Sequence, residues 1–392
     1  QLPVSGDGDF DFTRASSATR VNKDGFIEEV AVNVPRLDYS DGGCPSLLLE
    51  PTRSNLITYS EAFDNAYWTK NASSVVSGQL SPKGDLSAFK LVENTSTNSH
   101  KIFRANAFAS NVEYTYSFFA KKGERDFVSY VFSGVSNIAS VYFDLNNGVV
   151  GSTNVVSGMT LSDTSIKSFP DGWYRCSLTF TQTINTSANI TISDIDYGAN
   201  TPSYQGDGTS GVYIYGAQLE QGSYATSYIP TSGQSGGVTR VGDVCNNGGN
   251  EQVINSTEGV LYYESKVHSL TGDKAISVSA GSYQDSVSIG SYGGVFQARI
   301  RQGGNYVHFI SPSGVNLLNN NKIAILYSAS SIKIFVNGVL KSNVSGVTYS
   351  AILSKISFTR ADSVDFYYGE INDLRYYNTA LTDAELQALT TI

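Results

Sequence analysis

Paired carboxylates are the first arrangement in this sequence that could do chemistry, because hydrolysis of a glycosidic bond needs two carboxyl groups facing one cleft. Asp194 and Asp196 occupy alternate positions and therefore share a face of a predicted strand, but a Tyr-Gly-Ala-Asn turn follows them directly. The clusters Asp362–Asp365 and Glu370–Asp373 fit turns and a strand end better than a cleft. We therefore predict no catalytic residue and no enzymatic activity.

A bound calcium ion is the one cofactor that these carboxylates favour, since hard cations take several oxygen ligands from loop carbonyls and acidic side chains. The candidate ligands are Asp194, Asp196, Asp207 and Glu220, with Glu50 a weaker one. The alternative for each is an ordinary solvated carboxylate of a Gly-rich turn. Zinc is not expected, because the three histidines are far apart and carry no carboxylate motif around them.

Aromatic side chains near turns provide a second kind of candidate site, because the apolar face of a pyranose ring stacks on an exposed aromatic ring while amides bind its hydroxyls. The candidates for glycan binding are Trp68, Tyr197, Tyr204, Tyr283, Tyr292, Phe296, Asn305 and Tyr306. For each aromatic ring the alternative is packing on a sheet or contact with another subunit, since aromatic residues are common in strands. Trp173 is expected in a core.

Composition indicates the elements that must position such sites. The 392 residues include 37 Gly, 25 Tyr and 19 Phe but only 9 Pro and 1 Met, which is typical of many short strands joined by tight turns.

The net charge of −9, with the 26 basic residues scattered singly, argues against a nucleic-acid partner. No apolar run is long enough to insert into a membrane. Three dispersed cysteines predict small buried side chains rather than a disulfide framework.

The order of strand and turn signals predicts an all-β fold of two tandem jelly-roll β-sandwiches with an N-terminal arm and one short C-terminal helix. Asp24-Gly25 predicts a hairpin within an arm over residues 1–46. Alternating segments predict sandwiches over 47–230 and 251–392, separated by a Gly/Ser-rich linker over 231–250. Thr382 and Glu385 form a capping box that predicts the helix.

The last domain resembles the concanavalin A-like (laminin-G/pentraxin-type) jelly-roll family. The resemblance rests on two stretches, the paired strands 321–327 and 332–339 ending in Val-Asn-Gly, and the segment 369–386 with its strand and capped helix. The first domain is similar to carbohydrate-binding-module-like jelly rolls of phage tail and virion proteins. That similarity rests on Glu-Pro-Thr-Arg-Ser-Asn-Leu at 50–56, Asp-Gly-Trp-Tyr-Arg at 171–175 and the stretch 217–231, and the opening 12–22 also looks like the start of such proteins.

These resemblances imply a virion-associated protein of tail-fibre or capsid-decoration type, located on the particle surface. Three hypotheses follow from the sequence. The first is a non-catalytic attachment protein that binds cell-surface or environmental polysaccharide; the second is a purely structural subunit that binds other virion proteins; the third, ranked well below them, is a glycan-degrading enzyme. Resemblance to fibre proteins also implies a homo-oligomer, such as a trimer, although no heptad in the chain requires one.

Overall fold

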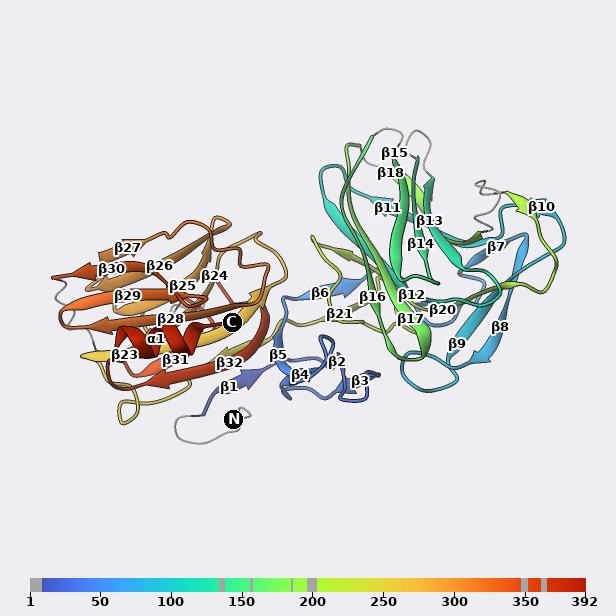
Figure 1. The fold of residues 1–392 in the computed structure, drawn as a ribbon. Helices are drawn as coiled ribbons and strands as arrows, with labels where there is room; N and C mark the ends of the chain where they lie inside the picture. The colour runs from blue at the N-terminus through green and yellow to red at the C-terminus, as the bar shows by residue number, and fades with distance from the viewer. Residues whose placement is uncertain are drawn as a thin grey trace. The chain divides into compact units, whose positions relative to one another are not determined.

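The computed structural model describes residues 9–133, 138–155, 158–184, 186–195, 203–346, 352–360 and 365–392 (Figure 1). Nearly all regular structure is β, and the helix α1 (Asp383–Thr390) is close to the C-terminus. The chain forms two compact units, each assembled from separate stretches of sequence. Unit 1 contains Gln1–Ser17, Val30–Thr52 and Val241–Ile392, and unit 2 contains Ala18–Glu29 and Arg53–Arg240. The prediction of an all-β protein with a short C-terminal helix is confirmed.

Unit 2 is a sandwich of two six-stranded antiparallel sheets. The first has the order β15 (Val149–Val155), β14 (Ile138–Asp144), β13 (Phe127–Ser133), β18 (Thr186–Ile195), β11 (Lys101–Phe108), β7 (Thr69–Asn71). The second has the order β16 (Met159–Ser168), β17 (Trp173–Gln182), β12 (Glu113–Lys121), β20 (Gly211–Gln221), β9 (Ala88–Glu93), β8 (Ser73–Gln79). Alternate residues of β12, such as Tyr116 and Phe118, point into the core between them.

The predicted hairpin is present in unit 2. The strands β2 (Ala18–Val21) and β3 (Ile27–Val30) are joined by a turn in which Gly25 donates its N–H to the carbonyl of Asn22 at 2.9 Å. Gly25 has φ +85°, and a Cβ atom there would lie 2.5 Å from the ring of Pro170. Glycine is therefore required both by the backbone conformation and by the space.

Unit 1 is a second sandwich, with a seven-stranded and a five-stranded sheet. The larger sheet has the order β30 (Val339–Ser345), β29 (Ser331–Val336), β28 (Asn321–Ser328), β23 (Glu258–Val267), β32 (Gly369–Tyr377), β5 (Ser46–Leu49), β4 (Arg36–Asp38). The smaller sheet has the order β27 (Asn305–Ile310), β26 (Val295–Gln302), β25 (Ser286–Tyr292), β24 (Lys274–Ser279), β31 (Lys355–Ser357). Their inner faces form one apolar core.

The helix α1 covers the outer face of the seven-stranded sheet (Figure 1). Its N-terminus carries the predicted capping box: the hydroxyl of Thr382 accepts from the N–H of Glu385 at 3.3 Å, and the N–H of Thr382 donates to the Glu385 carboxylate at 2.8 Å. Leu386 is buried against Val260 and Phe335. No helix among the described residues has the length and apolarity of a membrane span.

The division of the chain differs from the predicted boundaries. Residues 1–46, expected as an arm, are divided between the units: the β2–β3 hairpin belongs to unit 2, whereas β1 (Asp11–Thr13) and β4 belong to unit 1. Together with β5 they complete unit 1, where Leu49 pairs with Gly369 of β32 and is buried in the core. The expected linker over 231–250 contains β21 (Val238–Arg240), which pairs with β6 (Arg53–Asn55), and β22 (Val244–Asn246), which pairs with β1. The pairings join segments far apart in sequence, so local patterns do not reveal them.

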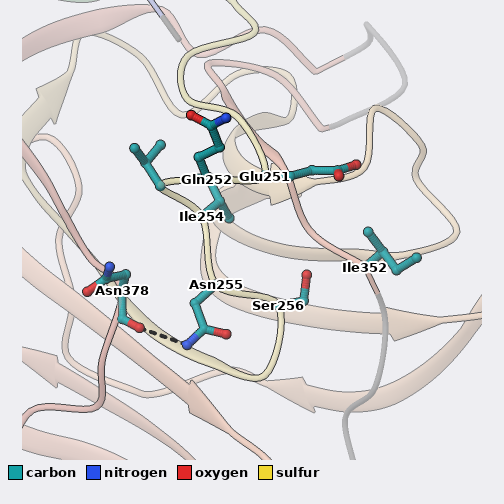
Figure 2. A pocket seen from close by; sticks show the side chains of 8 residues that line it. Glu251, Gln252, Ile254, Asn255, Ser256, Ile352 and Asn378 are labelled. Atoms are coloured by element: carbon teal, nitrogen blue, oxygen red, sulfur yellow. Dashed lines mark hydrogen bonds between the residues drawn. The ribbon is translucent and has the colours of Figure 1, made fainter.

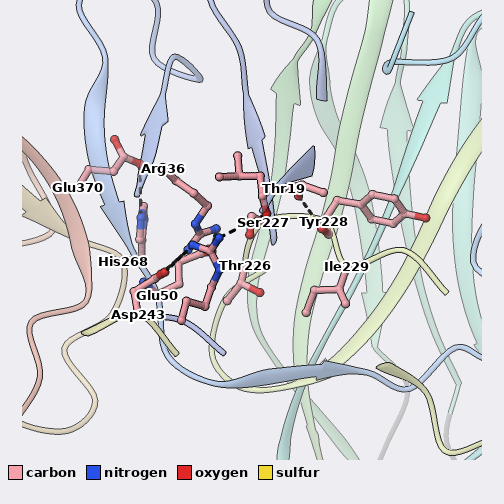
Figure 3. Close-up of polar contacts among 12 residues, drawn as sticks. Thr19, Arg36, Glu50, Thr226, Ser227, Tyr228, Ile229, Asp243, His268 and Glu370 are labelled. Atoms are coloured by element: carbon pink, nitrogen blue, oxygen red, sulfur yellow. Dashed lines mark hydrogen bonds and ion pairs between the residues drawn. The ribbon is translucent and has the colours of Figure 1, made fainter. Parts of the chain in front are cut away.

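A buried network of charges holds the separate stretches of unit 1 together (Figure 3). Asp243 accepts hydrogen bonds from Arg14 at 3.0 Å and from Arg36, and Arg36 also donates to Glu50 at 2.6 Å. None of the four side chains is more than 3% exposed. Neighbouring Glu50 and Asp243 outweigh the effect of burial and raise the pKa of Arg36 above its ordinary value. Because each of these buried groups lies against an oppositely charged partner, the network avoids the large cost of an unpaired buried charge.

Candidate functional site

The outer face of the five-stranded sheet in unit 1 brings together arginine and tyrosine side chains. In β26, Phe296, Ala298 and Ile300 point into the core. Arg299 and Arg301 alternate with them and therefore lie on the opposite face. We call the surface formed by Arg299, Arg301, Arg360, Tyr283, Tyr292 and Tyr306 the arginine–tyrosine face.

Arg301 is at the centre of this face. Its guanidinium carbon lies 3.9 Å from the ring centroids of both Tyr283 and Tyr306, and its Nη1 donates to the carbonyl of Gly304 at 2.9 Å. The guanidinium is therefore stacked against two aromatic rings and tied to the following turn. The hydroxyl oxygens of Tyr283 and Tyr306 are 3.5 Å apart.

The other two arginines extend the same arrangement. Arg299 stacks on Tyr292, with 3.5 Å between its guanidinium carbon and the ring centroid, and it donates twice to the amide oxygen of Gln297 at 2.9 and 3.0 Å. Arg360 lies 4.4 Å from the ring centroid of Tyr283 and pairs with Asp365 at 2.9 Å. Cation–π contacts of this kind fix the orientation of planar guanidinium groups on a surface.

The floor below the arginines is made of small side chains. Arg299 is opposite Ser288 and Arg301 is opposite Ser286 in the β25–β26 pair, and Ser277 of β24 is opposite Ser288. All three serines are completely buried. Because these serines are small, the longer side chains of Arg299 and Arg301 cover them, and the guanidinium groups lie nearer the surface. The ring of Tyr306 beside them is 48% exposed.

The electrostatics of the two central tyrosines differ. Partial burial raises the pKa of Tyr306, but its hydrogen bonds with Tyr283 and Arg301 and the charges of Arg299 and Arg301 outweigh this and lower its pKa below 10. Burial, with the Tyr306 hydroxyl next, raises the pKa of Tyr283. Tyr306 is therefore the phenol of this pair that ionises first.

The structure brings together three of the predicted glycan-binding aromatic residues, Tyr283, Tyr292 and Tyr306, with the exposed Asn305 at the neighbouring turn. The ring of Tyr306 is exposed, whereas Tyr283 is half-buried and has Arg301 and Arg360 over its ring. Tyr292 is buried beneath Arg299, and Phe296 belongs to the core of unit 1, so neither offers a free ring face for a sugar. The prediction of a rim of exposed rings must be corrected for these two residues.

The two candidates that the structure describes in unit 2 are both buried. Trp68 is buried in the core, and its indole N–H donates to the carbonyl of Tyr59 at 2.8 Å. Tyr204 is buried as well, and its hydroxyl donates to Glu93 at 2.6 Å. Neither ring is available for stacking with a ligand, because aromatic rings with this much apolar area pack into cores. Tyr197 lies outside the described residues.

The predicted calcium ligands that the structure describes are already engaged. Asp207 accepts from the N–H groups of Thr209 and Ser210, both at 2.7 Å, and these bonds together with the Ser210 hydroxyl hold its pKa well below the usual range. Glu220 is fully buried; its desolvation raises its pKa, although the N–H of Thr226 donates to it at 3.0 Å. Asp207 therefore caps its own turn and Glu220 is a core residue.

No group of three acidic, histidine or cysteine side chains with the spacing of a metal site occurs among the described residues. Asp196 and the side chain of Asp194 lie outside them. Glu50, the weaker candidate, pairs with Arg36 instead.

A separate hollow of about 460 Å³ in unit 1 is lined by residues 251–256, Ile352 and Asn378 (Figure 2). The amide N–H of Asn255 donates to the carbonyl of Asn378 at 2.9 Å, and its amide oxygen accepts from the N–H of Thr257 at 3.0 Å. Ser256 accepts from the N–H of Leu353 at 2.8 Å. These polar groups join loops to one another, so we regard the hollow as a structural junction.

The three arginines of this face were not among the site residues predicted from the sequence. The signal was present, since the alternation of Phe296, Ala298 and Ile300 with Gln297, Arg299 and Arg301 places the last three on the solvent side of one strand. Arg360 carried no such signal, because it follows β31 and reaches Tyr283 only through the fold.

Comparison with known proteins identifies the fold of unit 1. Residues 264–387 match the family described as the Concanavalin A-like lectin/glucanases superfamily. This confirms the resemblance found in the last domain. The comparison with curated proteins gave no match.

Solved structures share the sandwich only distantly. The Ruminococcus gnavus IT-sialidase CBM40, bound to α2,3-sialyllactose, is 18% identical with a TM-score of 0.32, and the match covers 38% of this chain and 94% of that one. Domain 4 of AbnA, a GH43 extracellular arabinanase from Geobacillus stearothermophilus in complex with arabinotriose, is 15% identical with a TM-score of 0.32, covering 38% and 73%. A SAP-like pentraxin from Limulus polyphemus is 13% identical with a TM-score of 0.30, covering 36% and 72%. Similarity at this level carries no argument about ligands.

Proposed function

We propose that this chain is a non-catalytic binding protein that attaches a virus particle to a polysaccharide through the arginine–tyrosine face. The observation that carries the proposal is the central stack, in which the exposed ring of Tyr306 lies beside the fixed guanidinium of Arg301. A ring face and oriented hydrogen-bond donors at one place are what a sugar ring needs, because its C–H face stacks while its oxygens accept hydrogen bonds.

The carboxylates near this face support binding rather than hydrolysis. Asp285 accepts from the N–H of Gly303 at 2.8 Å, and Asp365 pairs with Arg360 at 2.9 Å. Each is held by a structural partner, and a hydrolase would need two carboxyl groups directed at the scissile bond from either side. The proposal that the protein belongs to a virion surface rests on the resemblance of residues 12–22 and of the first sandwich to phage tail and virion proteins.

A structural subunit that contacts another virion protein remains the alternative. The same face exposes Phe309 by 52% and Val295 by 49%, and apolar side chains of this kind are also suited to protein contacts. The two functions differ in what the isolated chain binds: an attachment protein retains a polysaccharide without any other virion component.

Affinity electrophoresis of the whole chain through gels that contain different polysaccharides tests the proposal. We expect retardation in at least one gel, and Tyr306→Ala is expected to weaken binding by about tenfold, a typical loss for a central aromatic contact. Leu340→Ala on β30 is the matched control, since this exposed side chain belongs to the other sheet of unit 1. Equal binding by the wild type and Tyr306→Ala would contradict the proposed site.

A further inference from the structure

Among the residues that the structure describes, no carboxylate forms an ion pair with Arg299 or Arg301. Arg301 donates to a neutral carbonyl, that of Gly304, and Arg299 donates to a neutral amide, that of Gln297. Two such guanidinium groups on one strand are notable in a protein with a net charge of −9.

A second observation concerns the inner nitrogen of the Arg301 guanidinium. The Nε atom of Arg301 is buried and has no hydrogen-bond acceptor among the described residues. A buried donor without an acceptor costs free energy, more so when the group is charged, unless a ligand supplies the acceptor. Although this donor has no acceptor among the described residues, the stacking of Arg301 between Tyr283 and Tyr306 holds it in a fixed orientation.

The two arginines are spaced to act together. They are two residues apart in β26, which places their backbones about 7 Å apart on one face of the sheet. A guanidinium group presents a planar fork of N–H donors that matches an oxyanion with two acceptor oxygens, whereas neutral sugars are recognised mostly by mixed donors and acceptors. The donors here are cationic, and the ring of Tyr306 beside them provides a surface for the sugar itself.

We infer that the arginine–tyrosine face binds an acidic polysaccharide, with an anionic group of one sugar residue on Arg299 and Arg301 and the ring of that residue or its neighbour on Tyr306. This inference rests on the proposed function and specifies its ligand. Carboxylate and sulfate groups share the required chemistry. Arg360 pairs with Asp365 and stacks on the ring of Tyr283. It is a positioning residue, because it orients the Tyr283 ring, which in turn contacts Arg301.

Matched pairs of polymers separate charge from sugar recognition. Polygalacturonate and its methyl ester have the same backbone, with and without carboxylates, and dextran sulfate and dextran form the corresponding sulfate pair. We expect the whole chain to bind the charged member of at least one pair at least tenfold more tightly than the neutral member; which pair shows the difference identifies the anion. Binding is expected to weaken as salt is added.

Arg299→Gln and Arg301→Gln test the site. Each is expected to weaken binding to the acidic polymer by about tenfold, since a charge-assisted hydrogen bond is lost while the side chain stays long and polar. Arg375→Gln on β32 is the matched control, because its arginine belongs to the other sheet and its side chain is 54% exposed. Thermal unfolding of each variant verifies that the fold is retained.

The outcomes distinguish the inference from the function on which it rests. Equal binding to both members of each pair, lost in Tyr306→Ala, would overturn the acidic ligand and leave polysaccharide binding in place. Binding to none of the four polymers would overturn both. Equal loss in Arg375→Gln, or equally tight binding of single-stranded DNA through the same arginines, would show a general response to polyanions and would also overturn the inference.

Discussion

Arg14 and Asp243 form an ion pair of 3.0 Å with neither side chain exposed, although 229 residues separate them. The same aspartate binds Arg36, so one carboxylate near the start of the last stretch of unit 1 fixes two arginines from the N-terminal stretches. The N-terminal region is thus part of the sandwich that carries the arginine–tyrosine face.

Asp243→Asn is expected to lower the free energy of unfolding of unit 1 by about 3–5 kcal/mol, because it removes the buried carboxylate that pairs with both Arg14 and Arg36 and leaves Arg36 with Glu50 alone. Urea denaturation measures this loss. Asp126→Asn is the control: its pair with Lys122 at 2.9 Å is about half exposed, and such pairs contribute less than about 1 kcal/mol. Similar losses in the two variants would show that the buried network does not stabilise the unit.

Leu49→Ala tests the contribution of β5 to the core of unit 1. Leu49 is buried and pairs with Gly369, and removal of a buried leucine side chain costs about 2–5 kcal/mol through lost burial and the cavity it leaves. Leu318→Ala, at a leucine that is 44% exposed in the same unit, is expected to cost less than about 1 kcal/mol. A small effect at Leu49 would mean that unit 1 does not depend on its N-terminal strands.

Glu93 predicts an acid-sensitive contact in unit 2. Burial raises its pKa, but hydrogen bonds from Arg125 at 2.7 and 2.9 Å, from the Tyr204 hydroxyl and from the Asp207 N–H outweigh burial and lower it below 4.5. A folded-state pKa below the unfolded value gives stability that is present above the unfolded value and lost as pH falls through the folded one. Glu93→Gln is therefore expected to cost about 2–3 kcal/mol at pH 7 and progressively less in acid. A cost independent of pH would disprove the assignment.

The lowered pKa of Tyr306 predicts how ligand binding responds to alkaline pH. As pH rises through this pKa, which lies below 10, a phenolate forms beside Arg299 and Arg301 and repels an anionic ligand. The affinity for the acidic polymer is expected to fall over this range in the wild type. Tyr306→Phe keeps the ring and removes the ionisable group, so its affinity is expected to stay constant. The same decline in both proteins would exclude Tyr306 as its cause.

The three cysteines are expected to differ in reactivity towards thiol reagents. Cys44 is exposed, whereas Cys176 and Cys245 are buried, and burial followed by the charges of Asp243 and Asp11 raises the pKa of Cys245 to about 12. One thiol per chain should react in the native protein and three in denaturant, since the thiolate is the reactive form. Mass spectrometry of alkylated peptides identifies the sites. Native labelling of Cys245 would contradict its burial.

The sequence predicted the elements that depend on local chemistry. The Asp24-Gly25 hairpin and the Thr382–Glu385 capping box each depend on residues a few positions apart, and both are present. It did not predict that β5 pairs with β32, because Ser46–Leu49 is a short apolar run whose partner is distant in the chain. The aromatic candidates illustrate the same limit: Tyr306 is exposed and Trp68 is buried, although both lie near turns.

The assembly of unit 1 from both ends of the chain sets an order for its biosynthesis. β5 ends at Leu49, whereas its partner β32 begins at Gly369 and is therefore translated much later. The larger stretch of unit 2, Arg53–Arg240, is translated between them, so a nascent chain carries this stretch while β4 and β5 still have unpaired strand edges. We therefore expect the translation of β32, rather than that of the N-terminal region, to complete the sandwich that carries the arginine–tyrosine face.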